Sequence, residues 1–119
     1  MLHTKNSLHK LEIVLKCYIE KYARNKNFSL VLKTKYCKSY YGTYRGDLKR
    51  VTLYVTNIEG NFYPLSRLLL TLFHEISHHD EYQDKDFKRV KGVMHSPRFY
   101  EIFNSYKELI DFESLGRKN

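Results

Sequence analysis

The stretch LTLFHEISHHDEY, residues 70–82, decides how the rest of the chain is interpreted. Two of its histidines, His74 and His78, stand four positions apart, and Glu75 directly follows the first. Four positions are about one helical turn, so a helix would carry both imidazoles on the same side. Whether that side belongs to the core depends on where the apolar residues of the segment fall.

Apolar residues on the opposite side predict an amphipathic helix over 64–81. With His74 at 0°, His78 lies at ~40°, Glu75 is ~60° from His78, and the apolar side chains gather at ~120–220°. These apolar residues are Leu65, Leu68, Leu69, Leu72 and Ile76. Pro64 suits the first turn, where its missing N–H has no helical partner to lose. The two histidines and the glutamate are therefore predicted to face away from the core together.

This spacing suits a metal site that has its own general base. Imidazole nitrogens one turn apart can both bind Zn²⁺ at ~2.0–2.1 Å. A glutamate after the first histidine is poorly placed as a ligand, but it can take a proton from the water that attacks a carbonyl. The pattern is the H-E-x-x-H signature of zinc peptidases. We predict Zn²⁺ as cofactor, His74 and His78 as ligands and Glu75 as the catalytic residue. His79, at ~140° on the same wheel, is predicted to be a packed or hydrogen-bonded histidine.

A catalytic zinc ion takes three protein ligands and keeps one position open. The segment VMHSPRFYEIF, residues 93–103, offers His95 just before a predicted helix, after a loop long enough to fold back over the metal. Glu101 is the alternative, because some H-E-x-x-H enzymes take a glutamate from a following helix. We favour His95 as the third ligand.

The remaining patterns predict an α+β domain with a small mixed or antiparallel sheet. The predicted elements are a helix over about 7–25, a strand over 28–37, a bend or tight turn over 40–47, a strand over 50–57, a loop over 80–93 and a helix from Ser96-Pro97 to about 112. Ser96 is expected to cap that last helix and Pro97 to occupy its first position.

Length and charge bound the function. The chain has 119 residues, enough for a single domain over 1–119, and a formal net charge of +8. Such a charge favours an anionic partner, nucleic acid above all, although a merely solvated surface has the same composition. The basic residues beside the predicted site could follow a phosphate backbone, or they could belong to a solvated loop. They are Lys85, Lys88, Arg89 and Lys91.

The sequence also favours an intracellular protein. Its first fifteen residues are too polar for a secretory signal, and no stretch reaches the ~18 apolar residues of a spanning helix. Cys17 and Cys37 do not form a close pair and predict no disulfide. We expect a cytoplasmic or nucleoid/nuclear monomer that is not secreted and has no membrane partner.

The H-E-x-x-H pattern followed by His95-Ser96-Pro97-Arg98-Phe99 resembles the SprT-like zinc metalloproteases, a group that includes the WLM, YgjP-like and Spartan proteases. Those families carry a His-Gly-x-x-Phe or His-Ser-x-x-Phe element whose histidine is the third zinc ligand. The segment YYGTYRGDLKRVTLYVTN is similar to their glycine-centred segment and following strand, with Gly42 where YgjP-like proteins have Trp-Gly-Ser. The resemblance covers about residues 40–104.

The resemblance implies a minimal zincin-type fold and a zinc-dependent endopeptidase acting on protein substrates, including proteins bound or crosslinked to DNA. A substrate would pair along an edge strand, for which 50–57 is our candidate. Tyr100, Arg98 and Tyr106 are candidates for stabilising the oxyanion. Two alternatives remain: a catalytically inactive zinc-binding module, and a basic nucleic-acid-binding protein with incidental histidines.

Overall fold

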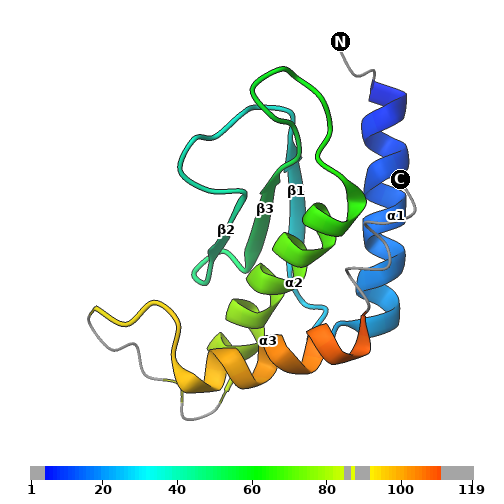
Figure 1. Cartoon of the computed structure of the whole chain (residues 1–119). Coiled ribbons are helices and arrows are strands. Elements are labelled where there is room, and N and C mark those ends of the chain that lie inside the picture. The colour runs from blue at the N-terminus through cyan, green and yellow to red at the C-terminus, as the bar shows by residue number, and fades with distance from the viewer. Residues whose placement is uncertain (1–4, 85–86, 88–91, 111–119) are drawn as a thin grey trace.

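Residues 5–84, 87 and 92–110 of the chain are described by a computed structural model (Figure 1). Within these residues the chain forms three helices and one three-stranded mixed sheet, the α+β class that the sequence predicts. The elements are α1 (Lys5–Tyr22), β1 (Ser29–Lys33), β2 (Gly42–Arg45), β3 (Arg50–Tyr54), α2 (Leu65–Tyr82) and α3 (Pro97–Leu109). No helix within the described ranges is both long and apolar enough to cross a membrane.

The helices follow the predicted periodicities and differ from the predictions by a few residues at their ends. Pro64 directly precedes α2, and the Ser96 hydroxyl accepts a hydrogen bond from the Phe99 N–H, so Ser96 caps α3 as predicted. The segment 80–93, predicted as a loop, begins inside α2. Its residues 85–86 and 88–91 lie outside the described part of the chain.

The order of the sheet is β1-β3-β2, with β1 parallel and β2 antiparallel to β3. The prediction that 50–57 is an edge strand is therefore wrong, because β3 has a partner on each side. Its side chains Val51 and Leu53 are fully buried, as expected for a central strand. The segment 40–47, predicted as a bend or tight turn, instead contains β2, which is an edge of the sheet.

The glycine at the start of β2 explains why this strand resembles a turn in the sequence. A Cβ at Gly42 would lie 2.9 Å from the Thr52 carbonyl oxygen and 2.9 Å from the Thr71 methyl carbon. Gly42 is thus present because β2, β3 and α2 approach closely there, and not because the chain reverses.

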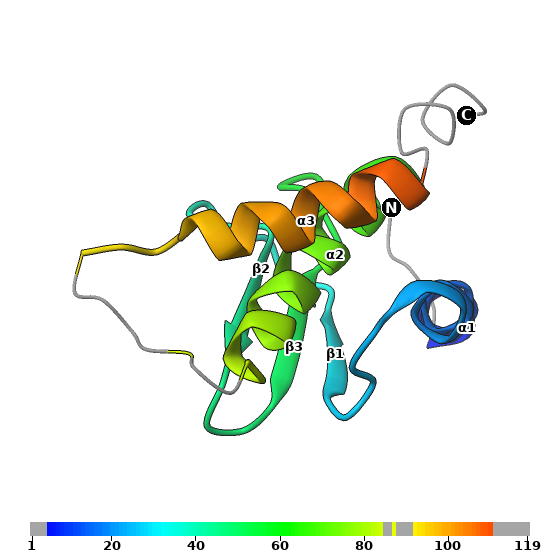
Figure 2. The same ribbon diagram turned by 90° about the horizontal axis from the view of Figure 1, so that it is seen from below.

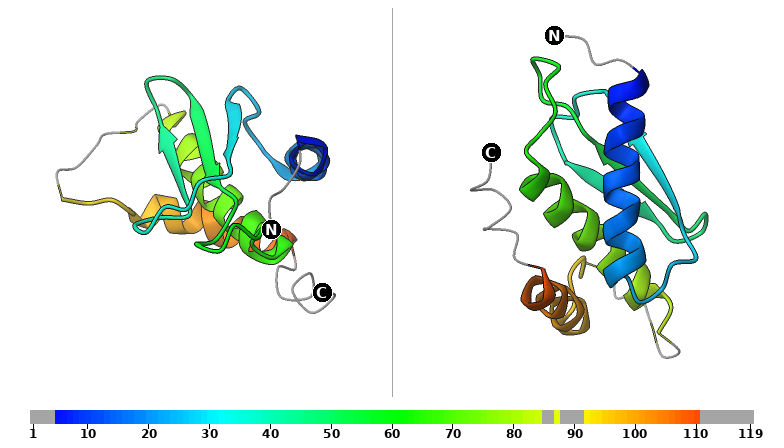
Figure 3. Two further views of the ribbon diagram at one scale, coloured as in Figure 1. Left: turned by 90° about the horizontal axis from the view of Figure 1, so that it is seen from above. Right: turned by 90° about the vertical axis from the view of Figure 1, so that its right-hand side faces the viewer.

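The helices are arranged in layers around the sheet. Figure 2 shows α2 between the sheet and α3, and Figure 3 shows α1 beside the β1 edge. The apolar face of α2 supplies much of the core, and burying each such side chain contributes about 1.5–3 kcal/mol. The fully or nearly buried core residues include Leu15, Ile19, Val51, Leu53, Leu68, Leu69, Leu72, Phe73, Ile76, Ile102 and Tyr106. The opposite face of α2 remains free to form a site against β2.

Candidate metal centre

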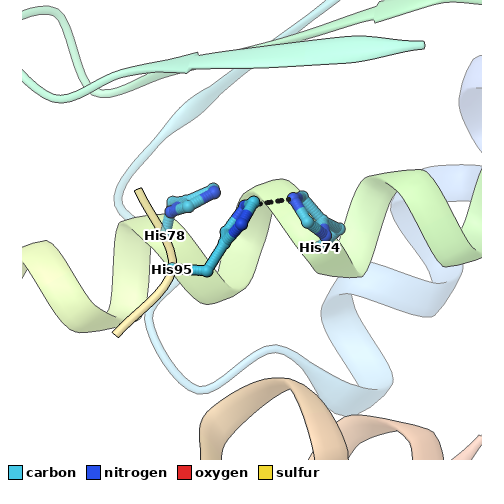
Figure 4. A group of neighbouring side chains, drawn as sticks. All are labelled: His74, His78 and His95. Atoms are coloured by element: carbon cyan, nitrogen blue, oxygen red, sulfur yellow. Dashed lines mark hydrogen bonds between the residues drawn. The ribbon is translucent and has the colours of Figure 1, made fainter. Parts of the chain in front are cut away.

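Three partly buried histidines from two parts of the chain meet on the side of α2 that lines the cleft. His74 and His78 project from α2 one turn apart, and His95 reaches them from the segment that precedes α3 (Figure 4). One ring nitrogen from each histidine lies within 4.8 Å of the other two. The Nε2 atoms of His74 and His95 are 3.2 Å apart. The three residues that the sequence predicts as ligands are thus brought together by the fold.

The spacing and chemistry of these nitrogens fit a metal ion. Tetrahedral coordination at 2.0–2.1 Å places neighbouring ligand atoms about 3.3 Å apart, close to the distance between His74 and His95. Imidazole is a ligand for Zn²⁺, Cu²⁺, Ni²⁺ and Fe²⁺. Three imidazoles also leave room for a further ligand, as in catalytic zinc sites. The cluster is therefore a candidate metal centre with an open position.

The ring of Phe99 forms an apolar floor under the three histidines. Its centroid lies 4.4 Å from that of His78 in a stacked arrangement, 4.9 Å from that of His74 and 4.7 Å from that of His95. Phe99 is fully buried. Phe103 adds an edge-on contact to His74 at 5.2 Å.

This apolar surrounding lowers the pKa values of His74 and His78 and keeps these two imidazoles neutral. Burial lowers the pKa of His74 to about 4, with the neighbouring His95 as the second cause. Burial likewise lowers the pKa of His78 to about 4, and the charges of His74 and His95 act in the same direction. A metal binds the neutral imidazole, so protons do not compete for these two ligands near neutral pH.

Glu75 lies beside the histidines and is almost enclosed. Only 7% of the residue is exposed, and its Oε2 atom is 3.9 Å from Nε2 of His74. Burial raises the pKa of Glu75 to about 7. A carboxyl group that titrates near neutral pH can both accept and donate a proton, which is what a general acid–base residue requires.

The histidines and Glu75 line a cleft between α2 and β2. The strand runs alongside the helix: Gly42 lies against Thr71, and Gly46, just after the strand, lies against the ring of Tyr82. Tyr41 bonds to β3 through its carbonyl oxygen, which accepts from the N–H of Tyr54. Because antiparallel pairs alternate, the main-chain groups of Gly42 and Tyr44 point away from β3. The cleft therefore has a metal-binding wall and a wall with main-chain hydrogen-bonding groups.

A buried glutamate that the sequence analysis missed fastens the His95 segment to α2. The Ser96 hydroxyl donates a hydrogen bond to Glu81, which is 8% exposed, and accepts one from the N–H of Phe99 at 3.1 Å. A second contact joins Nε of Arg98 to a carboxylate oxygen of Asp84 at 3.0 Å. Both acids lie at or just beyond the end of α2, and no periodicity in the sequence marks them as partners of residues near His95.

The alternative ligand Glu101 does not join the histidines. Its side chain is 66% exposed, and its carboxylate pairs with Arg98 at 3.3 Å. Within the described ranges, His74, His78 and His95 form the one group of three or more candidate ligands.

The four basic residues expected to contact phosphates lie outside the described residues. They are Lys85, Lys88, Arg89 and Lys91.

The oxyanion candidates are placed very differently from one another. Tyr106 is fully buried, and its hydroxyl donates to Asp80 in the core, on the side of α2 away from the cleft residues. Arg98 is engaged by Asp84 and Glu101. Tyr100 is half-exposed, and its ring centroid is 6.0 Å from that of His95. Of the three, Tyr100 alone contacts the histidine cluster through its ring.

His79 is a buried, hydrogen-bonded histidine, as predicted. It is fully buried, its Nδ1 lies 2.7 Å from the hydroxyl of Tyr44, and its Nε2 lies 2.9 Å from Oδ1 of Asn27. Burial lowers its pKa. Because both ring nitrogens are engaged, His79 ties α2 to β2 and to the loop before β1 instead of serving the metal centre.

Comparison of this chain with protein-family models, with curated proteins and with solved structures gives no match. The case for a functional site therefore rests on the geometry of the histidines, Glu75 and the cleft. The resemblance to SprT-like metalloproteases stays a prediction carried by short sequence motifs.

Proposed function

We propose that the protein is a zinc-dependent endopeptidase with a minimal zincin-type domain of the SprT-like kind. The observation that carries the proposal is the convergence of His74, His78 and His95 beside the buried carboxyl group of Glu75. A histidine cluster that merely decorates a surface does not need an enclosed carboxyl group next to it. General acid–base catalysis beside a metal, in contrast, requires a carboxyl group at this place.

The residues of the cleft divide the chemistry among them. His74, His78 and His95 would hold Zn²⁺, which when bound supplies a Lewis acid for a carbonyl oxygen and lowers the pKa of water to about 7. Glu75 takes a proton from the attacking water onto its carboxylate and returns it to the leaving amine. Phe99 keeps bulk water away from one side of the imidazoles.

An extended polypeptide is the substrate that this cleft favours. The edge strand β2 offers the main-chain groups of Gly42 and Tyr44 along the wall opposite the histidines, so a peptide can add to the sheet there. This strand replaces 50–57 in that role. An open edge accepts a chain at any point along its length, which favours an endopeptidase.

The positive net charge of the chain favours protein substrates that are bound to an anionic polymer such as DNA. A net charge of +8 attracts DNA at moderate salt, and a protein bound or crosslinked to DNA would then be concentrated near the cleft. We propose such proteins as the preferred substrates.

Metal analysis combined with a cleavage assay tests the proposal. Wild type, Glu75→Gln and the surface control Glu101→Gln are purified, their metal content is measured, and each is incubated with casein and with a protein crosslinked to a DNA oligonucleotide. We expect about one Zn²⁺ per chain in all three. Glu75→Gln should lose activity about 10²–10⁴-fold, whereas Glu101→Gln should retain it.

Each other outcome points to an alternative. Equal cleavage by wild type and Glu75→Gln would remove the peptidase proposal. Bound zinc without cleavage by any of the three would indicate an inactive zinc-binding module, and protein without a transition metal would leave a basic protein with incidental histidines.

A further inference from the structure

We infer that Arg67 forms a carboxylate-binding subsite at one end of the cleft and gives the enzyme a preference for acidic substrates. The ligand is a carboxylate, carried either by an aspartate or glutamate side chain or by the C-terminus of a peptide. The inference rests on the proposed peptidase function, because it assigns the substrate class of the same cleft.

The position of Arg67 on α2 places it in line with the metal centre. Arg67 precedes His74 by two helical turns, which is about 10 Å along the axis and nearly the same angular position. Thr71 lies on the same face between them, and all three residues line the cleft. A substrate that reaches from the histidines along β2 toward Gly42 therefore passes Arg67.

A tyrosine holds the guanidinium group of Arg67 in place. The Arg67 Cζ atom lies 4.7 Å from the centroid of the Tyr41 ring, and Tyr41 itself packs edge-on against Tyr63 at 5.2 Å. Stacking on a ring occupies the face of a guanidinium but leaves its N–H groups in the plane free to donate. An arginine held in this way is suited to bind a carboxylate through two parallel hydrogen bonds.

The charge of Arg67 has no acidic partner within the described ranges, in contrast to the other arginine of the cleft. Arg45, near the opposite end of β2, is paired with Asp47 at 2.8 Å. Arg98, next to the His95 segment, is paired with Asp84 and Glu101. Arg67 is therefore the cleft arginine whose charge remains available for a ligand.

The distance between Arg67 and the histidines limits where the acidic group can be. An extended chain advances about 3.3 Å per residue, so 10 Å corresponds to about three residues. Because the arginine side chain can reach in either direction, the acidic residue can lie two to four residues from the scissile bond, on one side of it only. The preference should consequently appear as an enrichment of Asp and Glu at a fixed offset from the cut.

A substrate-profiling experiment tests the inference on the zinc-loaded protein. Wild type, Arg67→Gln, Arg67→Glu and the matched control Arg45→Gln are each given the same mixture of synthetic dodecapeptides, and the cut sites are identified by mass spectrometry. We expect acidic residues to be enriched at one offset for wild type and for Arg45→Gln. Arg67→Gln should lose about tenfold in kcat/KM on the acidic peptides alone, and Arg67→Glu should favour Lys or Arg at that offset.

Repeating the assay with C-terminally amidated peptides distinguishes the two possible sources of the carboxylate, an acidic side chain and the C-terminus of the peptide. If a chain terminus is recognised, the cuts fall at a fixed distance from the C-terminus and disappear on amidation. If a side chain is recognised, internal cuts next to Asp and Glu survive amidation. An acid preference that is unchanged in Arg67→Glu, or the absence of any acid preference in wild type, would overturn the inference while leaving the peptidase proposal intact.

A measurement of peptide binding to the Glu75→Gln protein distinguishes failure of the proposed subsite from failure of the proposed peptidase function. Fluorescein-labelled peptides that differ only by Glu or Gln are titrated against zinc-loaded Glu75→Gln, with and without Arg67→Glu, and anisotropy is measured. If wild type cleaves nothing, about tenfold tighter binding of the Glu peptide that is lost with Arg67→Glu would still support the subsite. No cleavage and no difference in binding would remove both.

Discussion

The placement of Glu75 illustrates, at the scale of one residue, a conflict between stability and function. The Glu75 carboxyl group is 7% exposed and has no cation beside it among the described residues. It therefore loses hydration when it ionises, and its pKa rises to about 7. Because burial disfavours the ionised form, we expect a neutral isostere to be more stable at the same position. Such a cost is typical of a residue kept for its chemistry.

We therefore predict that Glu75→Gln stabilises the metal-free protein at pH values above about 7, by about 1–3 kcal/mol. Between 4.5 and 7 the native carboxyl group binds a proton that the unfolded one has released, so the native state of wild type loses relative stability as the pH rises through this range. The advantage of the variant should accordingly be full above pH 7 and shrink as the pH falls toward 4.5.

Urea denaturation in the presence of EDTA, near pH 8 and near pH 5, measures this difference. Glu101→Gln is the matched control, because its exposed carboxylate should contribute little at either pH. A Glu75→Gln variant that is less stable than wild type at pH 8 would show that the ionised carboxylate is stabilised by its surroundings.

At the scale of elements, the candidate centre depends on how α3 is joined to α2. Two ligands are one turn apart on α2 and need no tertiary contact to be neighbours, whereas His95 needs the Ser96–Glu81 hydrogen bond and the Asp84–Arg98 pair near it. The Ser96 hydroxyl contributes to both helices, because it donates a hydrogen bond to Glu81 of α2 and also caps α3.

We predict that Glu81→Ala lowers the affinity for Zn²⁺ about 10–100-fold, because contacts that orient a ligand have effects of this size. Ser96→Ala should lower it similarly and also destabilise the protein by about 1 kcal/mol through loss of the cap. Competition with a chromogenic chelator measures the affinity. Asp84→Asn, which alters a more exposed pair, is the control with the smaller effect. Unchanged affinity in Glu81→Ala would mean that His95 is positioned by Phe99 and the backbone alone.

The stability of the fold also depends on the close approach of β2 to α2. We predict that Gly42→Ala destabilises the protein by about 1–3 kcal/mol, because its Cβ meets a backbone oxygen that cannot move aside. Gly46→Ala should be less destabilising, since the nearest atoms belong to the ring of Tyr82, which is half-exposed and can rotate. Urea denaturation of both variants provides the comparison, and equal stabilities would contradict the assigned packing.

At the scale of the whole molecule, a bound metal would join the layer of α2 to the segment that leads into α3. A ligand that binds the native state alone stabilises it by about 4 kcal/mol at a thousandfold excess over Kd. We predict that EDTA lowers the Tm of wild type and that added Zn²⁺ restores it. His95→Asn should show a much smaller response, whereas Glu101→Gln should respond like wild type. Differential scanning fluorimetry with and without EDTA makes the comparison, and an equal response of His95→Asn would exclude His95 as a ligand.

The sequence by itself determined those features that depend on neighbours along the chain. The period of apolar residues defines α2 and its buried face, the four-residue spacing brings His74 and His78 together, and Ser96-Pro97 marks the start of α3. Each of these is decided within one or two helical turns, so no distant contact is needed to predict it. The burial of His79 follows from the same helical geometry.

Only the tertiary structure decided which strand is the edge, how enclosed Glu75 is, and which residues hold His95 near α2. A strand is central or peripheral according to its partners. β3 pairs with the neighbouring β2 on one side and with the more distant β1 on the other, and the pairing with β1 makes it central. Gly42 resembles a turn residue until Thr52 and Thr71 are placed against it. The structure alone likewise shows that Arg67 has no acidic partner in the part of the chain that it describes, whereas Arg45 and Arg98 pair with acids. Contacts between distant segments are set by the packing of the whole chain, and local patterns do not record them.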